Sequence, residues 1–146
     1  MARCYFRIDS CPMFLVVIVM MVCSGASELA MAQWASAYAE SALGFSKAVG
    51  DIAGCIVCGF SVGIMWPGTI SISSKAFPTG GTAMFALLAM AGDLGGSIGP
   101  AIVGRVADMF GGSIHVGMRI GLLFPITLCF MLFLFNIMNH NANKQK

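Results

Sequence analysis

The stretch that decides the fold is 80–100, GGTAMFALLAMAGDLGGSIGP. It is long and apolar enough to cross a bilayer as one helix, and it carries a single carboxylate, Asp93, near its middle. Its glycines recur at spacings that place them on one helix face, where small residues let neighbouring helices approach closely. A buried carboxylate beside a glycine-rich face is more typical of transporters than of soluble enzymes or passive membrane anchors.

Composition places the whole chain among membrane proteins. Of its 146 residues, 58% are hydrophobic and 10% are charged, and the mean hydropathy is +0.89. A soluble domain of this size is far less apolar. The formal net charge of +2 is small and the basic residues are scattered, which argues against a nucleic-acid partner.

The apolar segments predict one all-α, polytopic membrane domain that covers residues 1–146. Residues 33–50 are mixed and amphipathic, and we expect them to form a loop, with some helical extension of the first span. The chain has room for about four membrane-spanning helices of about 20 residues each. The four expected spans are 13–32, 52–73, 82–106 and 116–138.

The basic residues that flank these spans predict the orientation of the chain. Five of them would lie in the cytoplasm and three outside, which is a modest positive-inside bias. We therefore expect a multi-pass protein of the cell inner (plasma) membrane with both termini in the cytoplasm. The cytoplasmic set is Arg3, Arg7, Lys75, Lys144 and Lys146, and the outer set is Lys47, Arg105 and Arg119.

The first span has a second interpretation, as a cleaved signal peptide. Its basic leader, its apolar run and the triplet Ala30-Met31-Ala32 fit a secretory cleavage pattern. Glu28 just before that triplet, and the apolar segments that follow, favour an uncleaved helix.

The catalytic and metal-binding patterns that occur in the chain lack the surroundings that their chemistry needs. Cys55-Ile56-Val57-Cys58 has the spacing of a metal or redox pair but lacks a second pair or a nearby histidine. The spacing Gly-x-Ser-x-Gly occurs at 59–63 and at 95–99, but both matches lie inside apolar helical segments and not at the strand-to-helix turn that a nucleophile elbow needs. A Gly-Lys-Ser/Thr phosphate loop is missing from the sequence. We therefore predict no enzyme activity, no metal site and no cofactor.

Asp93 is the first candidate for a functional residue. An acidic group at the centre of a span is costly in lipid, so it should face a protein interior or a water-filled cavity. There it would bind a proton, a cation or a substrate hydroxyl. The alternative is a hydrogen bond between helices that only fixes their packing.

A second group of candidates lies at the end of the first span. Glu28, Gln33 and Trp34 lie close to one side of a helix if the span extends through Trp34. A carboxylate, an amide and an indole suit a polar ligand with an apolar face, such as a sugar. Trp34 would otherwise be an anchor in the aromatic belt at the membrane surface.

The glycine spacings predict close helix packing, and the prolines predict kinks. Small-residue motifs of this kind let two helix backbones approach each other. Pro100 and Pro67 add bends that moving helices can use. The packing residues expected on this basis are Gly59 with Gly63, Gly92 with Gly96, and Gly95 with Gly99, followed by Pro100.

Several segments resemble transporters of the major facilitator superfamily, in the branch related to fucose and other sugar permeases. Residues 77–85 and 92–100 resemble the region of the tenth to eleventh helices, and residues 26–40 resemble the seventh helix. Residues 51–54 resemble the start of the eighth helix, whereas 60–69 resemble the tenth. About two helices of the family pattern are therefore missing between them.

The resemblance implies a role in secondary transport of a small polar solute, such as a sugar. In that family two six-helix halves rock about a central cavity, and this chain would supply part of the second half, truncated and with an internal deletion. The matching positions imply that Glu28, Gln33, Trp34 and Trp66 bind substrate and that Asp93 has a gating or structural role.

The expected partners follow from this incomplete architecture. They are membrane lipid, a small polar solute, and either a complementary transporter half or further copies of the chain. A chain with only part of one half is expected to be inactive alone. The competing interpretation is a small four-span structural or interaction subunit of another membrane protein, which packs through its glycine faces.

Overall fold

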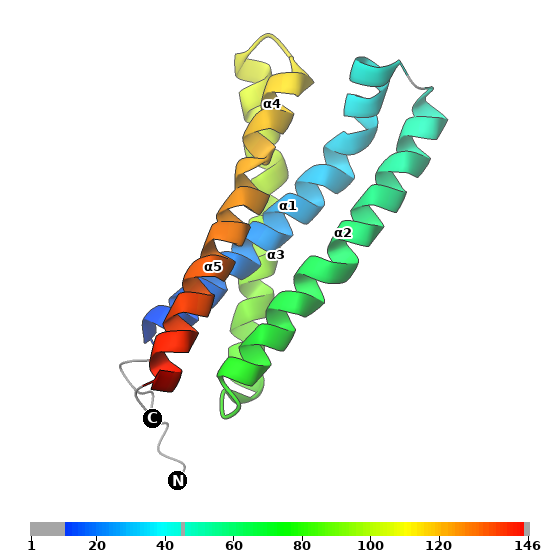
Figure 1. Ribbon diagram of the computed structural model, residues 1–146. Coiled ribbons are helices and arrows are strands. Elements are labelled where there is room, and N and C mark those ends of the chain that lie inside the picture. Colours follow the sequence, from blue (N-terminus) through cyan, green and yellow to red (C-terminus); the bar gives the residue numbers. More distant parts are fainter. Residues whose placement is uncertain (1–10, 45, 145–146) are drawn as a thin grey trace.

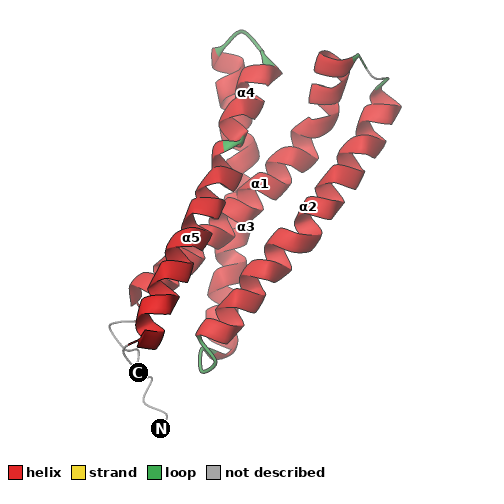
Figure 2. Ribbon diagram, in the orientation of Figure 1, coloured by secondary structure: helices red, strands yellow, loops and turns green. Residues whose placement is uncertain are grey.

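The chain folds as a bundle of antiparallel helices joined by short turns (Figures 1 and 2). The computed structural model describes residues 11–44 and 46–144, except the side chains at 11, 36, 39, 42, 43, 47, 51, 55, 57, 58, 61–63 and 141–144. All regular structure in these ranges is helical, as the sequence predicts. The helices are α1 (Cys11–Leu43), α2 (Lys47–Ala76), α3 (Gly81–Met109), α4 (Ile114–Gly121) and α5 (Leu123–Lys144).

Three stretches of the described chain are long and apolar enough to cross a membrane, which indicates a membrane-embedded protein. They are Pro12–Ala35, Gly81–Met109 and Ile114–His140, and they coincide with the first, third and fourth predicted spans. The second predicted span, 52–73, lies within the 30-residue helix α2. Its passage through the membrane remains a prediction.

The expected loop at 33–50 is much shorter than predicted. Helix α1 continues through Leu43 and α2 begins at Lys47, so only 44–46 connect them. Alanines make up much of this part of α1, and alanine has the highest helix propensity of all residues. The helix ends where Gly44 adopts a positive φ of 66°, a conformation that other residues rarely take.

The fourth predicted span is helical but divided into two pieces. Helices α4 and α5 follow each other with a break at Leu122. Pro125 lies three residues beyond the break and has no N–H to donate to the carbonyl of Gly121. The loss of this ladder hydrogen bond explains why the helix is interrupted here rather than continuous.

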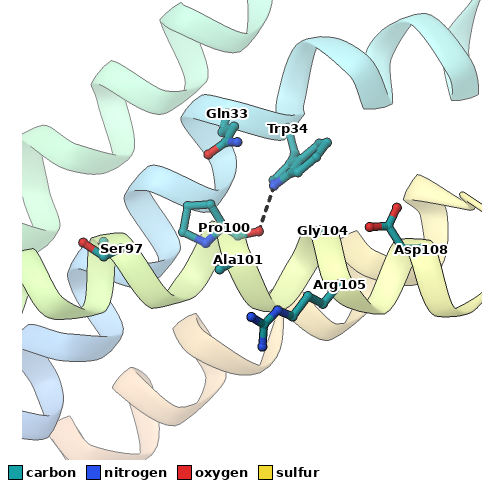
Figure 3. A pocket seen from close by; sticks show the side chains of 9 residues that line it. Gln33, Trp34, Ser97, Pro100, Ala101, Gly104, Arg105 and Asp108 are labelled. Carbon is teal, nitrogen blue, oxygen red and sulfur yellow. Dashed lines mark hydrogen bonds between the residues drawn. The ribbon is translucent and has the colours of Figure 1, made fainter.

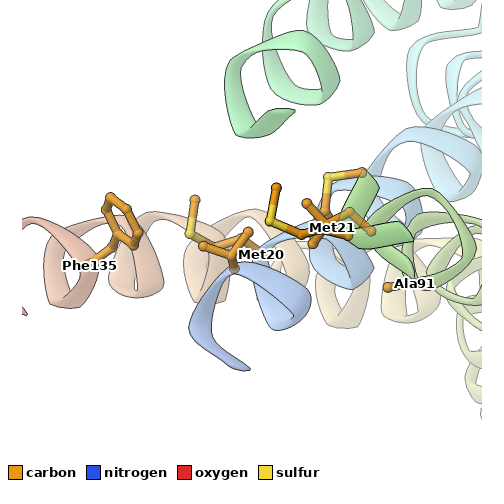
Figure 4. Close-up of a cluster of buried hydrophobic side chains, with 7 residues drawn as sticks. Met20, Met21, Ala91 and Phe135 are labelled. Carbon is orange, nitrogen blue, oxygen red and sulfur yellow. The ribbon is translucent and has the colours of Figure 1, made fainter. Parts of the chain in front are cut away.

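Helix α1 lies at the centre of the bundle and contacts α2, α3, α4 and α5. Its buried methionines, Met20 and Met21, are fully inaccessible and pack with Ala91 of α3 and Phe135 of α5 (Figure 4). At the end of α1 near these residues, the ring of Phe14 meets that of Phe77 edge to face at 5.8 Å. This cluster holds three helices together around α1 and fixes the end of the bundle opposite the α3–α4 turn.

Glycines bring the backbones of α1 and α3 into direct contact, as the Gly-x-x-x-Gly spacing predicts. A Cβ atom added to Gly95 would collide with the carbonyl oxygen of Val22, and one added to Gly25 would collide with that of Gly92. A Cβ on Gly99 would lie 2.5 Å from the carbonyl oxygen of Ala26. The two helices therefore pack at a distance that only glycine allows at these positions.

The other predicted packing positions divide into two groups. Gly92, Gly96 and Pro100 are buried with the glycines of α3, in agreement with the prediction. Gly59 lies on an exposed face of α2, and a Cβ there would meet nothing within 4 Å, so it makes no close helix contact in this chain. The surroundings of Gly63 lie outside the described residues.

Candidate functional site

A hydrogen bond between Trp34 and Pro100 organises the candidate site. The indole Nε1 of Trp34 on α1 donates to the carbonyl oxygen of Pro100 on α3 at 3.2 Å (Figure 3). The ring lies over Gly104, one turn further along α3, where an added Cβ would be 3.0 Å from Cζ2 of the indole. Absence of a side chain at Gly104 therefore leaves room for the tryptophan ring.

Beside this contact, α1 and α3 form an open groove with a volume of about 490 Å³. Its walls combine an amide, an indole, a hydroxyl, a guanidinium and a carboxylate. All of these polar groups except the half-buried indole belong to exposed residues. The lining residues are Gln33, Trp34, Gly96, Ser97, Pro100, Ala101, Gly104, Arg105 and Asp108.

The groove lies at one end of the apolar part of the bundle. Gln33 and Trp34 are close to the end of the apolar stretch Pro12–Ala35, and Arg105 and Asp108 belong to the last turns of α3. Beyond them, the ring of Tyr38 on α1 meets that of His115 on α4 at 5.2 Å. Charged and aromatic side chains at this height are typical of the zone where a membrane meets water.

Only two of the four predicted substrate-binding residues line the groove. Gln33 and Trp34 do, whereas Glu28 is half-buried on α1 and Trp66 lies on α2. The ring of Trp66 packs against the glycine face of α3, because a Cβ on Gly92 would be 2.7 Å from its Cη2 atom. The structure thus places Trp66 in a helix interface and separates it from Gln33 and Trp34.

Asp93 is exposed on this chain, so none of its described helices buries the carboxylate that the sequence predicts to be buried. It lies in the middle of α3, outside the glycine face that contacts α1 and one turn before Ser97. The hydroxyl of Ser97 donates to the backbone carbonyl of Asp93 at 3.0 Å. A carboxylate exposed to lipid in the middle of a span costs about 2.5–3.5 kcal/mol, which contact with water or with another protein would reduce.

Arg105 and Asp108 are the groove residues that sequence reasoning did not identify as candidates. In the sequence, Arg105 serves only as a basic residue that predicts the orientation of the chain in the membrane. Asp108 lies beyond the predicted end of the third span. Helical spacing places Ser97, Ala101 and Arg105 on consecutive turns of one face. That spacing is the signal in the sequence that points to a polar face at the end of α3, whereas its position next to Trp34 comes only from the structure.

The chemistry of the groove is that of polar recognition. Among the described side chains, no three His, Cys, Asp or Glu residues gather as a metal site would require. The described free thiols are Cys23, which is buried, and Cys129, which is exposed, and neither lines the groove. Hydrogen bonding, stacking on an indole and charge pairing are the interactions that the lining residues offer.

Comparisons with protein-family models, with curated proteins and with solved structures found no match to this chain.

Proposed function

We propose that this chain is a membrane protein that binds a small polar solute in the groove between α1 and α3, as part of a secondary transporter. The observation that carries the proposal is the set of polar and charged side chains that converges on Trp34 at the end of an apolar helix. Ligand sites commonly combine apolar walls with a few placed polar groups.

A neutral sugar is the solute class that suits these groups best. One face of a sugar ring is apolar and packs against an indole, while its hydroxyls donate to amide and carboxylate oxygens and accept from amide N–H groups. Gln33 and Asp108 supply such groups, and Arg105 supplies donors. The resemblance of 26–40 and 77–100 to sugar permeases points to the same class.

The proposal includes a topology. The chain would cross the plasma membrane four times, with α2 as the second span and with both termini in the cytoplasm. Lys75 lies in the last turn of α2, at the end of the bundle where both termini of the described chain lie (Figure 1). The groove would then open toward the outer surface, and alternating access would require a second half that faces it.

Uptake into proteoliposomes tests the transport part of the proposal. If further copies of the chain supply the missing half, radiolabelled monosaccharides should enter vesicles that contain the purified protein faster than they enter protein-free vesicles. Trp34→Ala should remove this difference, whereas Leu15→Ala, on the exposed side of α1, should leave it unchanged. Equal uptake by folded protein and by empty vesicles would contradict transport by this chain alone.

The second candidate function is that of an interaction subunit. The exposed carboxylate of Asp93 in the middle of α3 favours it, because this surface is poorly suited to contact with lipid. A subunit would co-purify with a different membrane protein in a fixed ratio. A transporter component that needs no other protein would purify as copies of this chain only. The mass of the detergent-solubilised particle distinguishes these two outcomes.

A further inference from the structure

Helix α3 presents a polar face that no other described helix covers. The face consists of Asp93, Ser97, Ala101, Arg105 and Asp108, all of which are exposed. The main contacts of α3 are with α1 and α4, which use its buried side. Two apolar side chains, Met90 and Leu94, lie on the same surface and are each 54% exposed. We call this surface the α3 polar face.

The two charges on this face, Arg105 and Asp108, are three residues apart on α3 and lie about 60° apart around its axis. The Arg105 side chain extends to one side of α3 and the Asp108 side chain to the other, toward the side of Trp34 (Figure 3). Neither forms an ion pair within the described part of the chain. A positive flank and a negative flank therefore border the same helix at nearly the same height.

We propose that the α3 polar face binds a second copy of this chain, related by a two-fold axis along the membrane normal. Such an axis places the positive flank of one helix opposite the negative flank of the other, so that Arg105 meets the partner's Asp108 twice. An inverted pair would place these charges at opposite membrane surfaces and leave them unmatched. Charge complementarity thus selects a parallel, symmetric pair.

This arrangement also accounts for two other features of the face. It covers the mid-span carboxylate of Asp93, which would otherwise contact lipid. It also places the second copy along the edge of the groove, because Ser97, Ala101, Arg105 and Asp108 belong to both surfaces. The pairing does not depend on transport or on any bound solute, so it and the proposed function can fail separately.

Disulfide crosslinking tests the geometry. In a variant whose native cysteines are replaced, Ala101→Cys should form a covalent dimer in membranes under mild oxidation, because the two copies of this residue lie near the axis. Ile102→Cys, on the same turn but away from the polar face, is the matched control and should stay monomeric. Equal crosslinking at both positions, or none at Ala101→Cys, would overturn the proposal.

Charge reversal tests the pairing in the chain with its own cysteines. Arg105→Asp alone and Asp108→Arg alone should each raise the dimer dissociation constant about tenfold or more, since each places like charges together. The double variant should restore it to within about threefold, because the two flanks exchange sign. Sedimentation in density-matched detergent measures these constants. A double variant as weak as the single ones, or singles as tight as the unaltered chain, would contradict the pairing.

Discussion

The indole N–H of Trp34 donates to the carbonyl oxygen of Pro100 at 3.2 Å and so ties the end of the apolar part of α1 to the proline of α3. Proline at this position has no N–H for the carbonyl of Gly96 and disturbs the helix ladder. The indole of Trp34 donates a hydrogen bond from the neighbouring helix α1 to the carbonyl of the same proline. Both residues line the groove, so this bond fixes the relative position of its two walls.

Trp34→Phe should lower the free energy of unfolding by about 0.5–1.5 kcal/mol, the usual net contribution of one hydrogen bond. Phenylalanine retains an aromatic ring over Gly104 but cannot donate to Pro100. Steric trapping in lipid bicelles measures the change.

Tyr38→Phe is the matched control for this substitution. It removes a phenolic hydroxyl but keeps the ring contact with His115. Its unfolding free energy should stay within a few tenths of a kcal/mol of the unaltered value. An equal loss in both variants would show that the Trp34 bond contributes nothing specific.

Gly95→Ala should destabilise the bundle by about 1–3 kcal/mol, because a methyl group here meets the backbone of Val22 and forces α1 and α3 apart. Gly68→Ala is the control on α2, where an added Cβ meets nothing within 4 Å. Alanine should there be neutral or stabilising by up to about 1 kcal/mol, from helix propensity. The same assay compares them, and a harmless Gly95→Ala would disprove direct backbone contact.

The helices of the bundle were largely predictable because hydropathy and helix length respond to the same physical quantity, the thickness of the apolar layer. The contact surface of α3 was predictable too, since Gly92, Gly95, Gly96 and Gly99 recur on one face. The length of α1 was not, because its final turns are stabilised by alanine propensity rather than by an apolar pattern.

The candidate site was only partly predictable. Gln33 and Trp34 were identified from their side-chain chemistry, but Arg105 and Asp108 belong to another helix, and a sequence does not state which helices are neighbours. The exposure of Asp93 follows from its position on the helix relative to the glycines. At 100° per residue it lies about 110° from the centre of the glycine face, so burial of that face turns Asp93 outward.

Leu88→Ala should cost about 2 kcal/mol or more, because Leu88 is fully buried in the cluster with Met20 and Met21 and its removal leaves a cavity. Leu15→Ala is the matched control on α1, where the side chain is 57% exposed and loses few packing contacts. Unfolding free energies in bicelles should differ clearly between the two variants. Equal values would show that this cluster is not a packed core.

Asp93→Leu should make insertion of α3 into a membrane more favourable by about 3 kcal/mol, since it removes a carboxylate from the centre of the span. Asp108→Leu is the control near the end of the same helix, where the effect should be distinctly smaller because a charge there reaches water. A glycosylation-based insertion assay measures both. Equal effects would place Asp93 outside the apolar layer.

The most direct test of solute binding is the fluorescence of Trp34 in a Trp66→Phe variant, where it is the one remaining tryptophan. Titration of the detergent-solubilised protein with L-fucose, D-galactose and D-glucose should give a saturable change in emission with at least one sugar. Gln33→Ala in the same background should abolish that change, whereas Leu15→Ala should preserve it. Emission that stays constant with all three sugars, or a response that survives Gln33→Ala unaltered, would contradict sugar binding in the groove.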